Sequence, residues 1–361
     1  MTDGPEAPRA IRLVRVQLPL LRAHRAAHGE EERRDLVLVE WRSTGDVSGW
    51  GECPTLSQPG YATETTDEAW EALRGRLAPA ALEGAPATGA GAAAAALADA
   101  ALDARLRAAG RSLREHLGGA RTRLARCVVL ADLQAPPATL AARAVEAIEG
   151  GARMVKVKVA PGTEVQVRTV VDAVGAARVA ADANGSFADP GELRALDELG
   201  LRYLEQPVPA SWDWDRIAEA RAALRTPVAL DESLTSLGAV RSALAEGALD
   251  VASIKPARLG GVEAAAEAAR TAAASAVDAF VGGMLELGVG RAAAAAVASL
   301  EGCTLPTDLG PSEQYVARDL TDPVRCDPGG LLLVPDGPGI GRTPDPDHLA
   351  AATVDEVLLR A

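Results

Sequence analysis

A repeat in the part of the chain after residue 120 restricts the fold more than any other feature. Short apolar runs recur about every 25 residues, and each is followed by a polar or glycine-containing turn and a helical stretch. Strands that alternate with helices predict a parallel sheet, and eight of them predict a closed α/β barrel of the TIM type. The eight runs cover residues 127–130, 154–159, 178–181, 201–204, 226–230, 250–254, 279–281 and 303–306.

An open, doubly wound sheet of the Rossmann type is the alternative. Such a sheet would place a glycine-rich phosphate-binding turn after its first strand. Residues 127–133, Cys-Val-Val-Leu-Ala-Asp-Leu, contain no glycine. The barrel is therefore the preferred prediction.

The residues before the repeat have a different organisation. Residues 11–18 and 36–41 have the composition of strands, and for the polar, charged stretch 22–35 between them we expect a long mobile connection. A third strand is expected to end in Gly49-Trp-Gly-Glu52, and residues 66–110 have a helical pattern. The first domain is therefore predicted to be α+β.

The end of the chain is rich in Pro and Gly, and its last stretch, residues 349–359, has the appearance of a helix. We expect this tail to pack back on the first domain. The predicted domains are residues 1–120, the α+β domain; 121–310, the barrel; and 311–361, the C-terminal segment.

Charge and composition exclude several classes of partner. A net charge of −13 disfavours binding to nucleic acid and to anionic membranes. No apolar run is long enough to span a membrane, and the first residues lack the features of a signal peptide, so a cytoplasmic location is predicted. Four widely spaced cysteines indicate neither a zinc site nor a disulfide framework. The oligomeric state is left open.

Lysine is rare in this chain, and its three positions are informative. Of 37 basic residues only Lys156, Lys158 and Lys255 are lysine. A lysine can be tuned to release its proton and act as a base, whereas an arginine stays charged. Lys156 and Lys158 lie two apart on a predicted strand, so they share a face and are expected to lower each other's pKa. A solvated basic face is the alternative, and the acidic residues nearby decide between the two.

Three carboxylates end the strands that follow. Asp182, Glu205 and Asp231 lie between Lys158 and Lys255 at steps of 23 to 26 residues, one strand–helix unit each. The C-terminal ends of barrel strands carry the active site, so these side chains should form one ring. Either aspartate alone could be a turn former or a helix cap. Three buried carboxylates together require a cation, and without a strand-end His or Cys the donor set fits Mg²⁺, or Mn²⁺, better than zinc.

This combination suggests proton abstraction next to a carboxylate. A divalent ion stabilises the enediolate that forms when the α-proton leaves, and a neutral lysine takes the proton. Another lysine stays cationic, and electrostatics alone leaves open which lysine has which role. A Schiff-base aldolase using Lys255 and a non-catalytic binding barrel are the rival hypotheses.

The motifs around these residues resemble the muconate-lactonizing subgroup of the enolase superfamily. The resemblance implies a (β/α)7β barrel and an α+β capping domain whose loops 21–32 and 53–60 close over it. It also implies a metal held by Asp182, Glu205 and Asp231, Lys158 as the base and Lys255 on the opposite face. The matching motifs are Gly49-Trp-Gly-Glu52, Leu113-Arg-Glu-His-Leu-Gly-Gly119, Lys156-Val-Lys158, Asp182-Ala-Asn184, Glu205-Gln-Pro207, Asp231-Glu-Ser233 and Lys255-Pro-Ala-Arg-Leu-Gly-Gly261.

Within this subgroup the chain is most similar to o-succinylbenzoate synthases of the actinobacterial type, on the stretches Val281-Gly-Gly-Met-Leu-Glu286 and 20–28. The resemblance implies dehydration of 2-succinyl-6-hydroxy-2,4-cyclohexadiene-1-carboxylate in menaquinone biosynthesis, with Lys158 moving the proton and Lys255 over the ring. N-succinylamino acid racemase, dipeptide epimerase and muconate cycloisomerase are alternatives on the same scaffold. The remaining site predictions are Lys156 as a third catalytic lysine, Asn184, Gly282 and Gly283 as substrate-binding residues, and Glu232 as a residue that orients a lysine.

Overall fold

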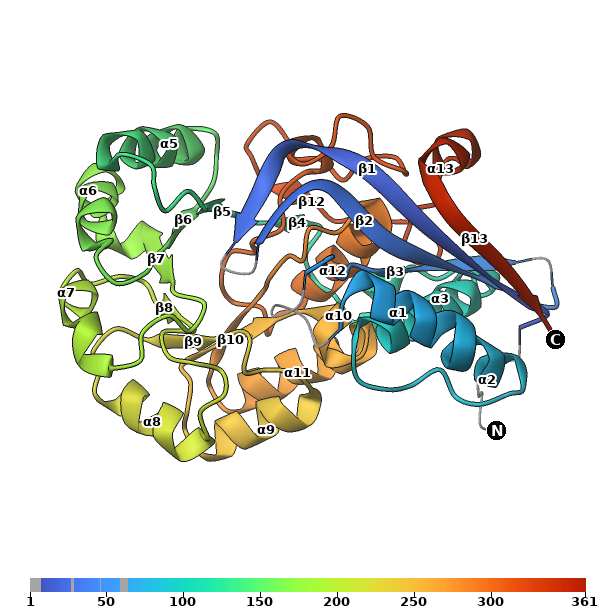
Figure 1. The fold of residues 1–361 in the computed structure, drawn as a ribbon, viewed down its shortest axis with the longest axis horizontal. Coiled ribbons are helices and arrows are strands. Elements are labelled where there is room, and N and C mark those ends of the chain that lie inside the picture. Colours follow the sequence, from blue (N-terminus) through green and yellow to red (C-terminus); the bar gives the residue numbers. More distant parts are fainter. Residues whose placement is uncertain (1–7, 27–28, 46, 59–63) are drawn as a thin grey trace.

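The computed structural model describes residues 8–26, 29–45, 47–58 and 64–361. A four-stranded antiparallel sheet in the order β13-β1-β2-β3 forms one side of the molecule, and a curled parallel sheet forms the other (Figure 1). The antiparallel sheet consists of β1 (Ala10–Ala26), β2 (Gly29–Arg42), β3 (Ser48–Cys53) and β13 (Thr353–Arg360).

Helices cover one face of the antiparallel sheet, and glycines set how closely they approach. A Cβ on Gly49 would lie 2.2 Å from the backbone nitrogen of Ala104, and one on Gly51 would lie 1.9 Å from the carbonyl oxygen of Ala96. The alanine-rich helix α3 therefore packs directly on β3, because β3 has no side chain at these two positions and the alanines of α3 carry only methyl groups. The helices of this region are α1 (Thr66–Ala72), the π-helical turn η1 (Leu73–Leu77), α2 (Ala78–Leu82), α3 (Ala92–Ala108) and α4 (Leu113–Leu117).

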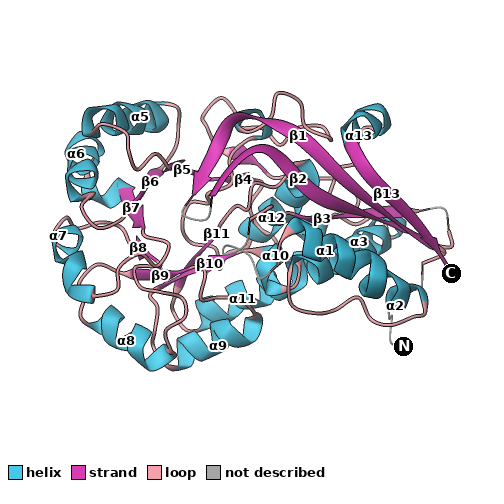
Figure 2. Cartoon of the chain, in the orientation of Figure 1, coloured by secondary structure: helices cyan, strands magenta, loops and turns pink. Residues whose placement is uncertain are grey.

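Seven parallel strands run in sequence order around the second sheet, and helices lie on its outside (Figure 2). The predicted barrel is confirmed. Its strands are β5 (Cys127–Leu130), β6 (Met154–Lys158), β7 (Val179–Asp182), β8 (Leu204–Glu205), β9 (Val228–Leu230), β10 (Val251–Ile254) and β11 (Asp278–Val281). The connecting helices are α5 (Pro137–Glu149), α6 (Glu164–Val174), α7 (Arg194–Asp197), α8 (Trp214–Ala222), α9 (Leu237–Ala245), α10 (Pro256–Leu259), α11 (Val262–Ala274) and α12 (Gly288–Ala298).

The predicted eighth strand, residues 303–306, is not a regular strand in the structure. Its segment nevertheless lies between β11 and β5, because Leu305 N–H donates to Ala279 O at 3.0 Å and Cys127 N–H donates to Thr307 O at 2.8 Å. Pro306 has no N–H to donate, which interrupts a continuous ladder at this point. The segment thus joins the two ends of the sheet without forming a full strand.

Two further expectations about local structure are wrong. The polar stretch 22–35 is not one long connection, since β1 continues to Ala26 and β2 begins at Gly29, with His24 opposite Glu31. Residues 349–359 are helical only to Ala352, where α13 (Pro346–Ala352) ends and β13 begins. The β-branched and alternating sequence of β13 pairs with β1, from Ala10 opposite Arg360 onward, so a distant strand decides its conformation.

Short elements complete the chain: β4 (Arg123–Leu124), which pairs with β12 (Leu332–Leu333), and the 3₁₀ turns η2 (Ala176–Arg178), η3 (Pro190–Leu193) and η4 (Ser312–Gln314). Within the described ranges, no helix has both the length and the apolar character needed to cross a membrane.

Candidate active site

The predicted ring of charged side chains forms at the C-terminal ends of the barrel strands. Lys158 and Asp182 are register partners in neighbouring strands, and Asp182 is in turn opposite Glu205. Asp231 follows the last residue of β9, and Lys255 follows the last residue of β10. Four of the five are buried: Asp182, Glu205, Asp231 and Lys255 are between 1% and 4% exposed. The regular strand–helix period therefore brings together residues that span nearly a hundred positions.

Lys158 lies in a chain of polar contacts. Its Nζ donates to Asp182 Oδ2 and to Asn184 Oδ1, both at 2.7 Å. Asn184 adopts a left-handed backbone with φ of 45°, and its Nδ2 donates to Glu232 Oε1 at 2.8 Å. Burial raises the pKa of Asp182, but the charges of Lys158 and Lys156 outweigh that effect and lower it. Asn184 thus links Lys158 to Glu232, and burial raises the pKa of the Glu232 carboxyl.

Lys156 is enclosed by acids. Its Nζ lies 2.5 Å from Glu205 Oε2, contacts Asp308 Oδ2, and lies 5.1 Å from the centroid of the Phe280 ring. Burial lowers the pKa of Lys156, but the charges of Asp308 and Glu205 outweigh it and raise this pKa well above its ordinary value. The expectation that the two neighbouring lysines lower each other's pKa is therefore wrong for Lys156. Asp308, which follows the eighth apolar run, stabilises the charged form of this lysine.

The third lysine shares its acid with an arginine. Lys255 Nζ lies 2.7 Å from Asp231 Oδ2, and Arg258 donates to Asp231 Oδ1 at 2.7 Å and to the Asp231 carbonyl at 2.8 Å. Burial raises the pKa of Asp231, but Arg258 and then Lys255 outweigh it and lower this pKa strongly. Arg258 lies one helical turn after Lys255, so the two cations hold the two oxygens of one carboxylate.

Gln206 fixes the corner where β8 and β9 end. It has a left-handed φ of 38°, and its side-chain oxygen accepts from the N–H groups of Asp231 and Ser233 at 3.1 and 3.2 Å. Its amide nitrogen donates to Val208 O and to Ser233 Oγ at 3.0 and 2.8 Å. A fully satisfied buried amide of this kind holds Glu205 and Asp231 in a set relative position.

Gly282 and Gly283 follow β11 beside Lys255. A Cβ on Gly282 would lie 2.7 Å from Lys255 Cε and 3.1 Å from Ser253 Oγ, whereas one on Gly283 would have no neighbour closer than 3.6 Å. The missing side chain of Gly282 therefore leaves room for Lys255. Contact of either glycine with substrate stays a prediction, as does the substrate-binding role of Asn184, whose side chain is engaged with Lys158 and Glu232.

A divalent metal ion fits the chemistry of these donors. Burial raises the pKa of Glu205 well above its ordinary value, and the charges of Asp182 and Asp231 add to that rise against the opposing effect of Lys156. A dication between the carboxylates would relieve this repulsion, since hard oxygen donors are the ligands that Mg²⁺ prefers. Over the described part of the chain, no three His, Cys, Asp or Glu side chains already converge as a metal cluster, and each of the three carboxylates is ion-paired to a lysine instead.

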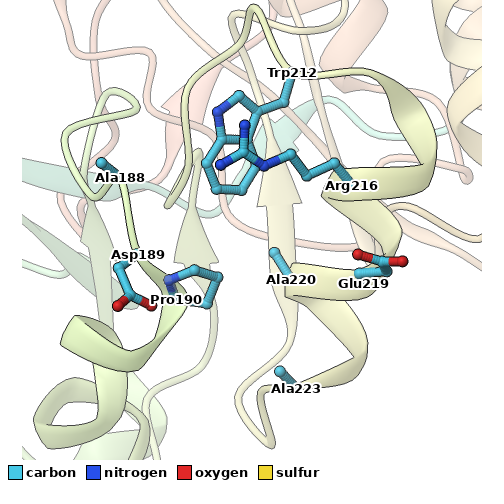
Figure 3. Close-up of a pocket in the computed structure, with 8 residues that line it drawn as sticks. All are labelled: Ala188, Asp189, Pro190, Trp212, Arg216, Glu219, Ala220 and Ala223. Atoms are coloured by element: carbon cyan, nitrogen blue, oxygen red, sulfur yellow. The ribbon is translucent and has the colours of Figure 1, made fainter.

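A separate hollow of about 480 Å³ lies outside this ring, between the loop after β7 and helix α8 (Figure 3). The guanidinium of Arg216 stacks over the Trp212 ring at 3.4 Å along one wall of it. None of its lining residues belongs to the ring of acids and lysines. They are Ala188, Asp189, Pro190, Trp212, Arg216, Glu219, Ala220 and Ala223.

Sequence reasoning missed residues that contact the ring from unexpected places. Asp308 follows the eighth apolar run, so the strand-end rule could have found it had the rule been applied to that run. Arg258 lies within the motif that begins at Lys255. It follows Lys255 by three residues, a spacing that places two side chains on the same face of a helix. Gln206 lies inside the Glu205-Gln-Pro207 motif, but its role depends on contacts with the backbone of Asp231 and Ser233, which its place in that motif does not report.

A capped, parallel α/β barrel with three strand-end acids and facing lysines defines the class of enzymes that abstract a proton next to a carboxylate. The chain belongs to the enolase superfamily: the model of the enolase C-terminal domain-like family matches residues 139–348.

Individual relatives carry two different activities in their names. An N-succinylamino acid racemase from an Amycolatopsis species is 36% identical over 363 residues, covering 96% of this chain and 98% of that protein. An o-succinylbenzoate synthase from Geobacillus stearothermophilus is 36% identical over 341 residues, 90% of each chain. Among solved structures, a probable mandelate racemase from Alicyclobacillus acidocaldarius superposes with a TM-score of 0.86 at 32% identity, covering 97% of this chain and 98% of that chain.

Proposed function

We propose that the protein is an o-succinylbenzoate synthase, which dehydrates 2-succinyl-6-hydroxy-2,4-cyclohexadiene-1-carboxylate to o-succinylbenzoate in menaquinone biosynthesis. The observation that carries this proposal is the pair of lysines, Lys158 and Lys255, each held by a different strand-end carboxylate. The synthases of that name among the relatives support the choice of substrate, with 36% identity for the Geobacillus stearothermophilus protein.

Asp182, Glu205 and Asp231 would hold the metal ion, Mg²⁺ or alternatively Mn²⁺. When bound, the ion supplies positive charge that stabilises the substrate carboxylate as the adjacent C–H bond breaks. The same ion would engage Asp182 and Asp231, which in the structure pair with Lys158 and Lys255. Both lysines would then have a weaker electrostatic hold on their protons.

Lys158 is the proposed base. Its neutral Nζ accepts the proton from the ring carbon next to the carboxylate, and the same proton then leaves on the departing hydroxide as water. The contact with Asn184 at 2.7 Å, supported by Glu232, orients Nζ for both transfers. Because the product is aromatic, the elimination is downhill and needs a single well-placed proton carrier.

The other two lysines keep their charge in this scheme. Lys255 would face the side of the substrate's six-membered ring opposite to Lys158, where its positive charge stabilises the π-system of the substrate. Lys156 stays protonated because Asp308 and Glu205 raise its pKa. It contributes positive charge to the site without exchanging a proton.

Racemisation of N-succinylamino acids is the second candidate, favoured by the racemase relative that covers 96% of this chain. Both reactions begin with removal of a proton next to a carboxylate, and both substrates carry a succinyl group. Racemisation requires a base on each face, which Lys158 and Lys255 would supply. The two functions therefore differ in whether Lys255 ever loses its proton.

The test compares both substrates with one enzyme preparation. Ultraviolet-monitored dehydration of the cyclohexadiene carboxylate is the expected activity, and loss of that activity in Lys158→Ala with an unchanged circular dichroism spectrum would support the assigned base. Rapid α-proton exchange of N-succinylamino acids in D₂O without any dehydration would replace the proposal with the racemase. Wild-type turnover in Lys158→Ala would refute the mechanism for either substrate.

A further inference from the structure

Arg34 is a fully buried arginine of the capping domain whose partners lie in three different segments. It is 0% exposed and lies in β2. Its Nε donates to Leu285 O at 2.8 Å and its Nη2 to Met284 O at 3.3 Å, both in the barrel loop after β11. Its Nη1 donates to Thr55 O at 2.6 Å and to Asp35 O at 3.1 Å. One guanidinium thus joins β2, the capping loop after β3 and the barrel.

The charge near Arg34 is only loosely balanced. Among the described residues, the carboxylate paired with it is that of Glu31, whose Oε2 lies 3.6 Å from Arg34 Nη1 and whose other oxygen accepts from Ser57 N–H at 2.7 Å. A buried cation bound mainly to carbonyl oxygens costs desolvation energy that an apolar side chain would avoid. What the arginine provides is geometry, because its planar fork fixes the directions of several carbonyl groups at once.

The barrel loop that Arg34 holds is strained and adjoins Lys255. Leu285 has a left-handed φ of 56°, which a branched side chain seldom adopts without support. Gly282, three residues earlier, is the residue that makes room for Lys255. A second contact acts on the same loop, since Glu52 accepts from Leu287 N–H and Gly290 N–H at 2.7 and 2.8 Å. The capping domain therefore fixes the whole segment from Met284 to Gly290.

We infer that Arg34 is a positioning residue for substrate specificity: it sets the distance between the capping loop at Thr55 and the barrel loop at Met284–Leu285, and so shapes the site for the end of the substrate remote from the reacting carbon. This inference rests on the proposed succinyl substrates. Arg34 touches no reacting atom and acts through the two loops that it joins.

The variant Arg34→Lys keeps the charge but cannot reach the carbonyl groups of both loops. Arg121→Lys is the matched control, because Arg121 also donates to backbone carbonyls, those of Leu300, Glu301 and Cys303, and contacts none of the ring residues by these bonds. Both variants should lose some thermal stability. Only Arg34→Lys should alter how substrate binds.

Steady-state kinetics distinguish an effect of Arg34 on substrate positioning from an effect on the stability of the protein. For Arg34→Lys we expect KM for the preferred succinyl substrate to rise about tenfold or more while kcat falls less than about threefold, since proton transfer at Lys158 is untouched. N-acetylamino acids, which lack the remote carboxylate, should be exchanged with nearly unchanged KM. Arg121→Lys should keep both parameters. An unchanged KM for the succinyl substrate in Arg34→Lys would overturn the inference.

Amide hydrogen exchange provides a readout that needs no activity. In Arg34→Lys the segments 54–58 and 284–290 should lose protection together, whereas Arg121→Lys should leave both as in the wild type. Loss of protection in one segment alone would show that Arg34 does not couple them and would sink the inference. A wild-type enzyme without activity on succinyl substrates would refute the proposed function, and the exchange experiment would still decide the role of Arg34.

Discussion

Replacing Gly282 by alanine should disable Lys255 while leaving the fold intact. The added Cβ would lie 2.7 Å from Lys255 Cε, whereas ordinary contacts between carbon atoms begin at about 3.5 Å. The lysine side chain is flexible, so it rather than the backbone must move, by about 1 Å. Its Nζ lies 2.7 Å from Asp231 Oδ2, and a displacement of that size breaks the contact.

The expected loss of stability in Gly282→Ala is small, whereas the expected loss of activity is large. Overpacking of this kind costs about 1–3 kcal/mol, and the flexible neighbour favours the lower end. A misplacement of about 1 Å at a reacting group costs on the order of a hundredfold in rate. For N-succinylamino acids, the substrates of the second candidate function, exchange of the α-proton that faces Lys255 should fall by about that factor, and exchange of the proton that faces Lys158 by less than about threefold.

The assay measures α-proton exchange in D₂O separately for the two enantiomers of an N-succinylamino acid, together with dehydration of the cyclohexadiene substrate. Gly75→Ala, in η1, is the control for an added methyl group, because a Cβ there would have no neighbour within 4 Å. Equal exchange of both enantiomers in Gly282→Ala, at the wild-type rate, would refute the reasoning. So would an equal loss in Gly75→Ala.

Other measurements check separate parts of the structure. Gly51→Ala should destabilise the protein by more than about 3 kcal/mol or prevent folding, because its Cβ would meet a rigid helix carbonyl at 1.9 Å; a melting temperature within a few degrees of wild type would contradict the packing of α3 on β3. Burial raises the pKa of Glu52 to about 7, so its carboxyl favours folding at low pH and that contribution is lost as the pH rises through 7. Between pH 5 and 8 the wild type should therefore lose up to about 3 kcal/mol relative to Glu52→Gln, and parallel denaturant profiles for the two proteins would count against this. Native thiol titration should detect Cys326 alone, since burial raises the pKa of the other three thiols further and all three are buried; rapid labelling of a second cysteine would contradict this. Chelation should abolish turnover and added Mg²⁺ should restore it, whereas activity that survives chelation and is trapped by borohydride on Lys255 would favour the aldolase hypothesis.

The sequence determined the barrel and the set of residues at its mouth. The strand–helix period is a local property, and in a parallel barrel a fixed step along the chain corresponds to a fixed step around the ring. For that reason the spacing alone assigns Lys158, Asp182 and Glu205 to neighbouring strand ends, where the structure has them. Membership of the enolase superfamily was predicted from the same motifs and is confirmed.

Only the tertiary structure decided the electrostatics and the capping sheet. Lys156 holds its proton because Asp308, some 150 residues later, lies against it, and no pattern around Lys156 reports that contact. Residues 353–360 form a strand because β1 offers them an open edge. Arg34 binds carbonyl groups some 250 positions away. In each case the deciding energy is a contact between segments distant in sequence, whereas spacing and composition report only what neighbours along the chain prefer.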